Sequence, residues 1–301
     1  MFIIKHKTAF FLFTALVTLA ALAAIAAFGL HLGIDFKGGT LLSVTYEESR
    51  PTVADLETSV RPLGYGEVRI QPSDDKDLLV RTREISTAEK DALLLALSLS
   101  GSAPLIEKSF TAIGPSIGKE LTNKAIAAII AIVLALLAFI TFAFRKVSKP
   151  VSSWKYAVIA IVTLVHDMLV PMGVFAYLGF ARGAEVDSLF VVALLAILGI
   201  SINDTIVVFD RVRENLRRRE EMNTKEPFDE TVGKSLNQTI VRSINTSLTV
   251  VFVLLALFFF GPETTKNFAL MLTVGMIAGT YSSIFLASPL LVVWERYAKR
   301  T

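Results

Sequence analysis

Six long apolar stretches limit what this chain can fold into more than any other feature of its sequence. An α-helix rises about 1.5 Å per residue, so about 20 apolar residues cross the roughly 30 Å hydrocarbon core of a bilayer. The chain is 53% hydrophobic, with a mean hydropathy of +0.60, and the excess lies in runs. We predict an α-helical integral membrane protein with six transmembrane helices, at about residues 8–30, 125–144, 156–181, 188–209, 243–262 and 267–294.

Residues 1–30 are predicted to hold a short tail and the first transmembrane helix. A cleaved signal peptide is the alternative, since Ala24-Ile25-Ala26 loosely fits a small-residue cleavage site. The apolar region of a signal peptide spans only about 7–15 residues, and the uncharged run 8–30 is longer. Length therefore favours a helix that stays in the membrane.

Residues 31–124 differ in kind, because they are charged, contain many Pro and Gly, and hold no long apolar run. Alternating apolar residues and turn signals predict strands at 39–46, 66–71, 77–83 and 105–113. Helices are predicted at 52–63 and 87–99, the second capped by Ser86 or Thr87. This β-α-β-β-α-β order predicts one α+β ferredoxin-like domain, inserted after the first transmembrane helix.

The basic residues indicate how the chain is oriented. The net charge is only +3, and Lys and Arg gather at the ends of the apolar runs, so no nucleic-acid partner is expected. The basic segments are the N-terminal tail, the loop 145–155, the connector 211–242 and the tail 296–301. Basic loops stay on the cytoplasmic side, so we predict that both termini are cytoplasmic and that domain 31–124 is extracytoplasmic.

The connector 211–242 is predicted to be amphipathic and to lie on the cytoplasmic face before the fifth transmembrane helix. Pro227 suits a first helical turn, and apolar residues then recur every four positions at Phe228, Val232, Leu236 and Ile240. An ordinary connector packed on its own protein explains the pattern equally well.

A carboxylate inside the fourth apolar run is the first candidate for function. Asp204, beside Asn203, lies about two thirds of the way along the stretch 188–215. An Asp near the centre of a membrane helix costs roughly 2.5 to 3.5 kcal/mol, so it usually faces protein or a wet cavity. A proton relay is one interpretation. An interhelical hydrogen bond is the other, with possible partners Asn203, Ser201, Ser243, Asn245 and Thr246.

Two further sites are weaker candidates. His166 and Asp167 lie near the centre of the third run, and neighbours on a helix do not share a face, so we expect only one of them to point inward. Asp167 could serve a proton path or accept a hydrogen bond from another helix. Arg242, at the mouth of the fifth run, and Asp210, at the end of the fourth, are explained by position at the membrane edge alone.

The sequence offers little for other chemistry. It has no cysteine and only three histidines, His6, His31 and His166, so we expect neither a disulfide nor a metal site, and no cofactor. Gly38-Gly39 lacks the Lys-Ser/Thr of a phosphate-binding loop. With no Ser-His-Asp pattern, we do not expect an enzyme. The small-residue stripe Gly275, Gly279 and Ser283 is expected to serve helix packing.

Five motifs, in order along the whole chain, resemble the SecF family. They are Gly33-Ile34-Asp35-Phe36-Lys37-Gly38-Gly39-Thr40, His166-Asp167, the stretch from Ser201 through Asn203-Asp204 and Asp210-Arg211 to Asn215, Ser235-Leu236-Asn237-Gln238-Thr239 with Arg242, and Gly279-Thr280-Tyr281-Ser282-Ser283-Ile284. This family provides the six-span subunit of the bacterial SecDF complex, within the resistance-nodulation-division (RND) superfamily. The resemblance implies the half-transporter arrangement of that superfamily.

The resemblance also implies a role and partners. Paired with an obligate SecD, such a protein uses the proton-motive force to draw unfolded preprotein from the SecYEG channel, with YajC and a YidC-type insertase as possible neighbours. Asp204 would be the carboxylate of the proton path and Arg242 its basic modulator. The implied location is the bacterial inner membrane.

Two alternatives to this role stay open. An RND-type proton-driven exporter of small molecules or lipids is one, although such exporters usually carry a second large external domain. A scaffold that moves no protons is the other, and it predicts that Asp204 tolerates replacement by Asn.

Overall fold

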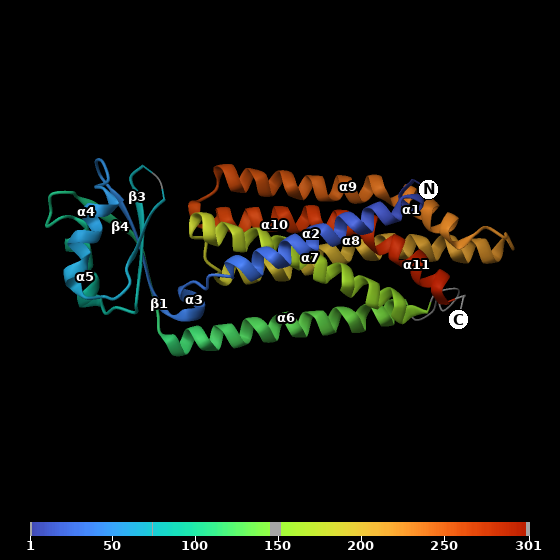
Figure 1. Ribbon diagram of the computed structural model, residues 1–301, viewed down its shortest axis with the longest axis horizontal. Coiled ribbons are helices and arrows are strands. Elements are labelled where there is room, and N and C mark those ends of the chain that lie inside the picture. The colour runs from blue at the N-terminus through green and yellow to red at the C-terminus, as the bar shows by residue number, and fades with distance from the viewer. Residues whose placement is uncertain (1, 74, 145–151, 299–301) are drawn as a thin grey trace. The chain divides into compact units, whose positions relative to one another are not determined.

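A computed structural model describes residues 2–73, 75–144 and 152–298 and divides the chain into two compact units (Figure 1). Unit 1 comprises Met1–His31 and Ala128–Thr301, and unit 2 comprises Leu32–Ala127. The division falls inside helix α6 (Pro115–Ala143).

Unit 2 has the predicted ferredoxin-like order. Its strands are β1 (Gly39–Tyr46), β2 (Arg69–Pro72), β3 (Asp77–Thr82) and β4 (Leu105–Ile113), and its helices are α3 (Ile34–Lys37), α4 (Val53–Val60), the 3-10 turn η1 (Arg61–Leu63) and α5 (Thr87–Leu97). The strands form one antiparallel sheet in the order β2-β3-β1-β4. A β-α-β unit split by an inserted strand produces this order, so the prediction is confirmed.

Alternation along β1 explains which face of this sheet is covered. Leu42, Val44 and Tyr46 are almost fully buried, and they pack in one cluster with residues of α4 and α5, such as Leu56 and Leu93. Successive strand side chains point to opposite faces, so the two helices cover one face of the sheet. Ser86 caps α5 in a capping box with Glu89, which decides between the two expected caps.

Unit 1 is built of helices. They are α1 (Phe2–Lys5), α2 (Lys7–Phe28), the second half of α6, α7 (Ser153–Arg182), α8 (Ser188–Glu221), α9 (Phe228–Phe260), α10 (Glu263–Ser282), the π-turn η2 (Ser283–Ala287) and α11 (Ser288–Ala298). Among the described residues, six helices are long and apolar enough to cross a membrane. The predicted fold class, six transmembrane helices with a small α+β domain, is confirmed.

Helix α10 lies at the centre of unit 1, because it packs against α7, α8 and α9 (Figure 1). The small-residue stripe allows this close approach: a Cβ on Gly279 would lie 3.0 Å from the Ser201 Cβ, and one on Gly275 would lie 2.3 Å from the Ile197 Cδ1. Small residues let helix backbones approach each other in membranes. The packing role expected for this stripe is therefore observed.

The connector 211–242 differs from its prediction. It forms no separate helix on the membrane surface, because α8 continues to Glu221 and α9 already starts at Phe228. Ion pairs three or four residues apart, such as Arg211–Glu214 and Arg217–Glu221, accompany α8 beyond the apolar run. Such pairs stabilise helices, and residues 211–221 contain no Gly or Pro that would interrupt the helix. The four apolar residues spaced along 228–240 belong to α9 itself.

The last predicted span, 267–294, is interrupted by the π-turn η2. Pro289 follows shortly after it and has no N–H to donate to the carbonyl four residues earlier. Ser288 Oγ donates to the Ser283 carbonyl at 3.4 Å. The wider turn η2 thus lies between α10, which ends at Ser282, and α11, which begins at Ser288. Such π-turns occur frequently at functional sites.

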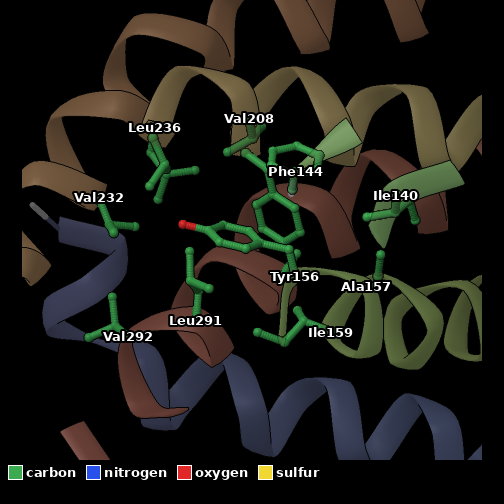
Figure 2. Close-up of a cluster of buried hydrophobic side chains, with 14 of the residues drawn as sticks. Ile140, Phe144, Tyr156, Ala157, Ile159, Val208, Val232, Leu236, Leu291 and Val292 are labelled. Carbon is green, nitrogen blue, oxygen red and sulfur yellow. The ribbon is translucent and has the colours of Figure 1, made fainter. Parts of the chain in front are cut away.

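A cluster of buried side chains lies inside unit 1, and Tyr156 is in the middle of the part that Figure 2 shows. The Tyr156 ring stacks on Phe144, with centroids 5.2 Å apart, and meets Phe209 edge-on at 5.1 Å. Figure 2 shows its hydroxyl pointing among Val232, Leu236 and Leu291. Within the described ranges this hydroxyl has no hydrogen-bond partner.

Replacing Tyr156 with phenylalanine is expected to leave the stability of the protein unchanged or to raise it. An unpaired buried hydroxyl costs about 1–3 kcal/mol, and Phe keeps the ring packing. The measurement is the thermal unfolding midpoint of the purified full chain. Tyr281→Phe is the matched control, because the Tyr281 hydroxyl donates to the Phe10 carbonyl at 3.1 Å, and its loss should lower the midpoint. A lower midpoint for Tyr156→Phe would contradict the prediction.

Candidate functional site

Asp204 connects three helices of unit 1. It lies on α8, is only 6% exposed, and accepts a hydrogen bond from Ser247 Oγ of α9 at 3.2 Å. Ser247 in turn accepts from Thr280 Oγ1 of α10 at 2.6 Å. Among the described residues, this carboxylate thus accepts from one neutral donor, at the end of a short chain of hydroxyls.

Asp167 forms a second buried carboxylate site, on α7. The residue is fully buried and accepts hydrogen bonds on Oδ2 from the hydroxyls of Ser201 (α8) and Ser282 (α10), the latter at 2.7 Å. Its Oδ1 lies 2.9 Å from His166 Nδ1. Asp167 therefore ties α7 to both α8 and α10.

The expectation that only one of His166 and Asp167 points inward was wrong. Both are buried, at 5% and 0% exposure, and they contact each other. Side chains on adjacent helical positions leave the helix about 100° apart, but α7 packs against α2, α8 and α10, so more than one of its faces is covered. The imidazole can then turn toward the neighbouring carboxylate inside the protein.

The two carboxylate sites share the same pair of helices. Ser201, which bonds Asp167, lies three residues before Asp204 on α8, and thus on the same side of that helix. On α10, Thr280 belongs to the Asp204 chain of hydroxyls and Ser282 to the Asp167 site. Between them in the sequence is Tyr281, whose hydroxyl oxygen forms a hydrogen bond of 3.1 Å with Thr14 Oγ1 of α2. Three consecutive residues of α10 therefore contact three different helices.

The remaining predicted site residues lie outside this core. Asn203 and Arg242 are exposed. No ion pair joins Arg242 to Asp204 in the part of the chain that the structure describes, although the two interact electrostatically over a longer distance. Asp210 pairs with Arg213 at 3.6 Å. Arg211 donates to Gln238 of α9 at 2.6 Å, which links the extensions of α8 and α9.

The predicted residues Asp35, Gly38 and Gly39 all lie in unit 2. Asp35 is in the short helix α3, and the two glycines form the turn into β1, with φ of 79° and 133°. A Cβ on Gly38 would lie 2.9 Å from the Pro115 backbone, and one on Gly39 would lie 2.8 Å from the Thr82 carbonyl oxygen. These glycines therefore serve the backbone of the turn.

Sequence reasoning missed the hydroxyls that hold the two carboxylates. Ser201 was expected near Asp204 but bonds Asp167, and within the described part of the chain Asp204 accepts from Ser247 rather than from Ser243, Asn245 or Thr246. The actual partners are Ser247, Thr280 and Ser282, each of which stands beside other polar residues in the sequence. Their signal was the presence of hydroxyl side chains within the fifth and sixth predicted membrane helices. Which carboxylate each one serves depends on how the helices are rotated against one another.

This arrangement suits the uptake and release of a proton. Ionised Asp204 accepts a hydrogen bond from Ser247, and protonated Asp204 can donate one to the same oxygen, because a hydroxyl both donates and accepts. Both states therefore have a partner at the same place. Among the described residues no group of three His, Cys, Asp or Glu side chains could hold a metal ion.

Two protein-family models match this chain. The family model described as "Protein export membrane protein SecD/SecF, C-terminal" matches residues 99–297, and "SecD/SecF GG Motif" matches residues 23–49. The protein translocase subunit SecF of Thermobaculum terrenum is 42% identical over 97% of this chain and 93% of its own length. SecF of Anaerolinea thermophila is 37% identical over 97% of this chain and 94% of its own.

Longer relatives contain the same part. The protein translocase subunit SecDF of Bacillus subtilis is 32% identical over 95% of this chain, which matches 37% of that protein. The crystal structure of SecDF from Thermus thermophilus superposes with a TM-score of 0.83 at 31% identity, covering 97% of this chain. The chain spans 38% of that solved structure's length. By family model, by near full-length identity and by fold, this chain belongs to the SecF family of protein translocase subunits.

Proposed function

We propose that this chain is the SecF subunit of a SecDF-type complex and couples the proton-motive force to late steps of preprotein translocation through SecYEG. The observation that carries the proposal is the setting of Asp204, a buried carboxylate on a membrane-spanning helix that accepts a hydrogen bond from the Ser247 hydroxyl. Intramembrane carboxylates mark proton paths in pumps and transporters. The family membership supplies the process that the protons would drive.

The energy of proton entry is sufficient to move helices. One charge that crosses a potential of 100 mV gains roughly 2.3 kcal/mol. Protonation of Asp204 removes a charge from the junction of α8, α9 and α10 and reverses the donor role in its bond with Ser247. A change in the packing of these three helices is the proposed first mechanical step, and it would be passed to the domain at 31–124.

SecD is the proposed obligate partner. Exposed polar residues within the apolar runs of α8 and α9 support a protein neighbour rather than lipid there: Asn203, Asn245 and Thr246. The matching SecDF chains of other bacteria support the pairing. Against such a partner, Arg242 would modulate Asp204 from the side. Unfolded preproteins are the proposed clients, with YajC and a YidC-type insertase as further neighbours.

The proposed placement is the bacterial inner membrane, with both termini cytoplasmic and the domain 31–124 outside. Basic residues at 1–7, 145–155, 211–242 and 296–301 support it. In this orientation the long charged ends of α8 and α9 reach into the cytoplasm.

The test is preprotein translocation into membrane vesicles that contain SecYEG and the cognate SecD, with and without this chain. ATP is kept in excess and the proton gradient is varied. We expect the chain to add a component of translocation that disappears when the gradient is collapsed. A component that persists without the gradient would contradict proton coupling, and no added component at all would contradict the translocation role.

A further inference from the structure

His166 is held at one ring nitrogen and open at the other. Nδ1 lies 2.9 Å from Asp167 Oδ1, whereas Nε2 is buried and has no hydrogen-bond partner among the described residues. The side chain is 5% exposed. A buried ring nitrogen without a partner costs free energy unless a proton, a water molecule or another group meets it. The site is therefore incomplete at Nε2.

The hydrogen bonds of Asp167 determine which ring nitrogen of His166 carries the proton of the neutral imidazole. Its Oδ2 accepts from the hydroxyls of Ser201 and Ser282, so Oδ1 is left for the imidazole. A carboxylate is an acceptor, and it therefore selects the tautomer with the proton on Nδ1. In that tautomer Nε2 is the basic nitrogen.

We propose that His166 and Asp167 form a second proton-binding centre beside Asp204, in which His166 Nε2 takes up and releases the proton and Asp167 positions the imidazole. The step is a plain protonation: a proton from water adds to the Nε2 lone pair, and the resulting imidazolium pairs with the Asp167 carboxylate. Release reverses it, and no other bond changes. The inference deepens the function proposed above and rests on it for what the proton drives.

Few other charges face this centre. The Tyr281 ring of α10 lies 6.3 Å from the His166 ring, centroid to centroid. On α8 the nearest titratable position in sequence to Ser201 is Asp204. Beyond Lys7, α2 carries no titratable residue, and η2 carries none. The remaining charged residues of α10 are Glu263 and Lys266 at its start, and those of α11, which also packs against α7, are Glu295 and Arg296 near its end, with the phenol of Tyr297 beside them.

The two proton-binding centres are coupled through α10. Thr280 reaches Ser247 and so Asp204, and Ser282 reaches Asp167, with only Tyr281 between them. A shift of this segment changes both sites together, and the π-turn that follows at Ser283 interrupts the regular helix there. Coupling between two sites is reciprocal, so the state of Asp204 should alter proton binding at His166.

The test is nitrogen-15 magnetic resonance of the three labelled histidines in the full chain, purified with its SecD partner in lipid nanodiscs. His6→Gln and His31→Gln assign the other two signals. We expect His166 to show a protonated Nδ1 and a bare Nε2 at the alkaline end of a titration between pH 5 and pH 9, and two protonated nitrogens at the acidic end. A His166 signal that does not change across this range overturns the proposal.

Substitutions test whether Asp167 positions the His166 imidazole or only packs beside it. Asp167→Asn removes the carboxylate that would pair with the imidazolium, so His166 should be protonated less readily than in the wild type, because a neighbouring negative charge favours the charged imidazolium. It should also mix the two tautomers. Asp204→Asn should move the midpoint of the His166 titration in the intact chain, and less so in a Ser282→Ala background. An Asp167→Asn spectrum identical to wild type overturns the positioning role, and a midpoint indifferent to Asp204→Asn overturns the coupling.

The spectroscopic result is independent of translocation. If His166 titrates as expected while translocation ignores the proton gradient, the centre exists and the proposed function fails. If translocation depends on the gradient while His166 is silent, the function holds and this centre is refuted.

Discussion

Proton-dependent translocation is expected to fall to the level without the chain when Asp204 is replaced by asparagine. The amide has the same shape and can still accept from Ser247 Oγ, which lies 3.2 Å from the carboxylate. The amide cannot ionise, so it cannot take up or release a proton. The roughly 2.3 kcal/mol that one proton gains on crossing a potential of 100 mV is then no longer available to move the helices. The measurement is export of a secreted reporter in cells whose own SecF is depleted and replaced by the variant.

The controls for this experiment come from the same chain of hydroxyls. Ser247→Ala keeps the titrating carboxylate and removes its donor, so it should reduce proton-dependent export without abolishing it. Membrane levels by immunoblot and co-purification with SecD show whether each variant is assembled. Unchanged export with Asp204→Asn would mean that Asp204 only joins helices, and the scaffold interpretation would then hold.

Replacing Gly38 with alanine is expected to destabilise unit 2 severely, by about 2–5 kcal/mol. Its φ of 79° lies in the left-handed region, which costs an L-residue roughly 1–2 kcal/mol. The new Cβ would also lie 2.9 Å from Cα and N of Pro115, which are backbone atoms that cannot rotate away. Overpacking of this kind costs a further 1–3 kcal/mol or so.

Gly64→Ala is the matched control for this prediction. Gly64 has a similar φ of 70°, but a Cβ there meets nothing within 4 Å. It should therefore lose only the backbone part of the free energy. Amide hydrogen exchange of β1 and β3 in the full chain measures both variants, and equal protection in Gly38→Ala and Gly64→Ala would refute a steric role for Pro115.

Much of the fold could be predicted from local pattern. Uncharged runs of about 20 residues have few alternatives to membrane helices, because each backbone polar group must be satisfied within the helix. Alternation in 39–46 and the turn signals around it likewise predicted the ferredoxin-like order, which β1 and its neighbours have. The ends of the elements were less predictable: α8 runs on to Glu221, with ion pairs along it and only Val212 and Leu216 as buried apolar residues beyond Phe209.

Asp204 and Asp167 show where prediction of the site stopped. The free-energy cost of a charged side chain inside the membrane was enough to single out both carboxylates, since that cost depends only on the residue type and its position along one helix. Their partners were not predictable in this way. Ser247, Thr280 and Ser282 come from helices distant in sequence, and Ser201 bonds Asp167 although Asp204 is much nearer along the chain.

Six membrane helices, one small α+β domain and carboxylates at membrane depth follow from the amino-acid order alone, because hydrophobicity and strand alternation act locally. That His166 and Asp167 both face inward, and that residues 280–282 of α10 connect them with Asp204, became known only from the packing of the helices. The physical reason is that hydrogen bonds between helices depend on the rotation and register of each helix. Those are set by close packing at positions such as Gly275 and Gly279, among all the helices at once.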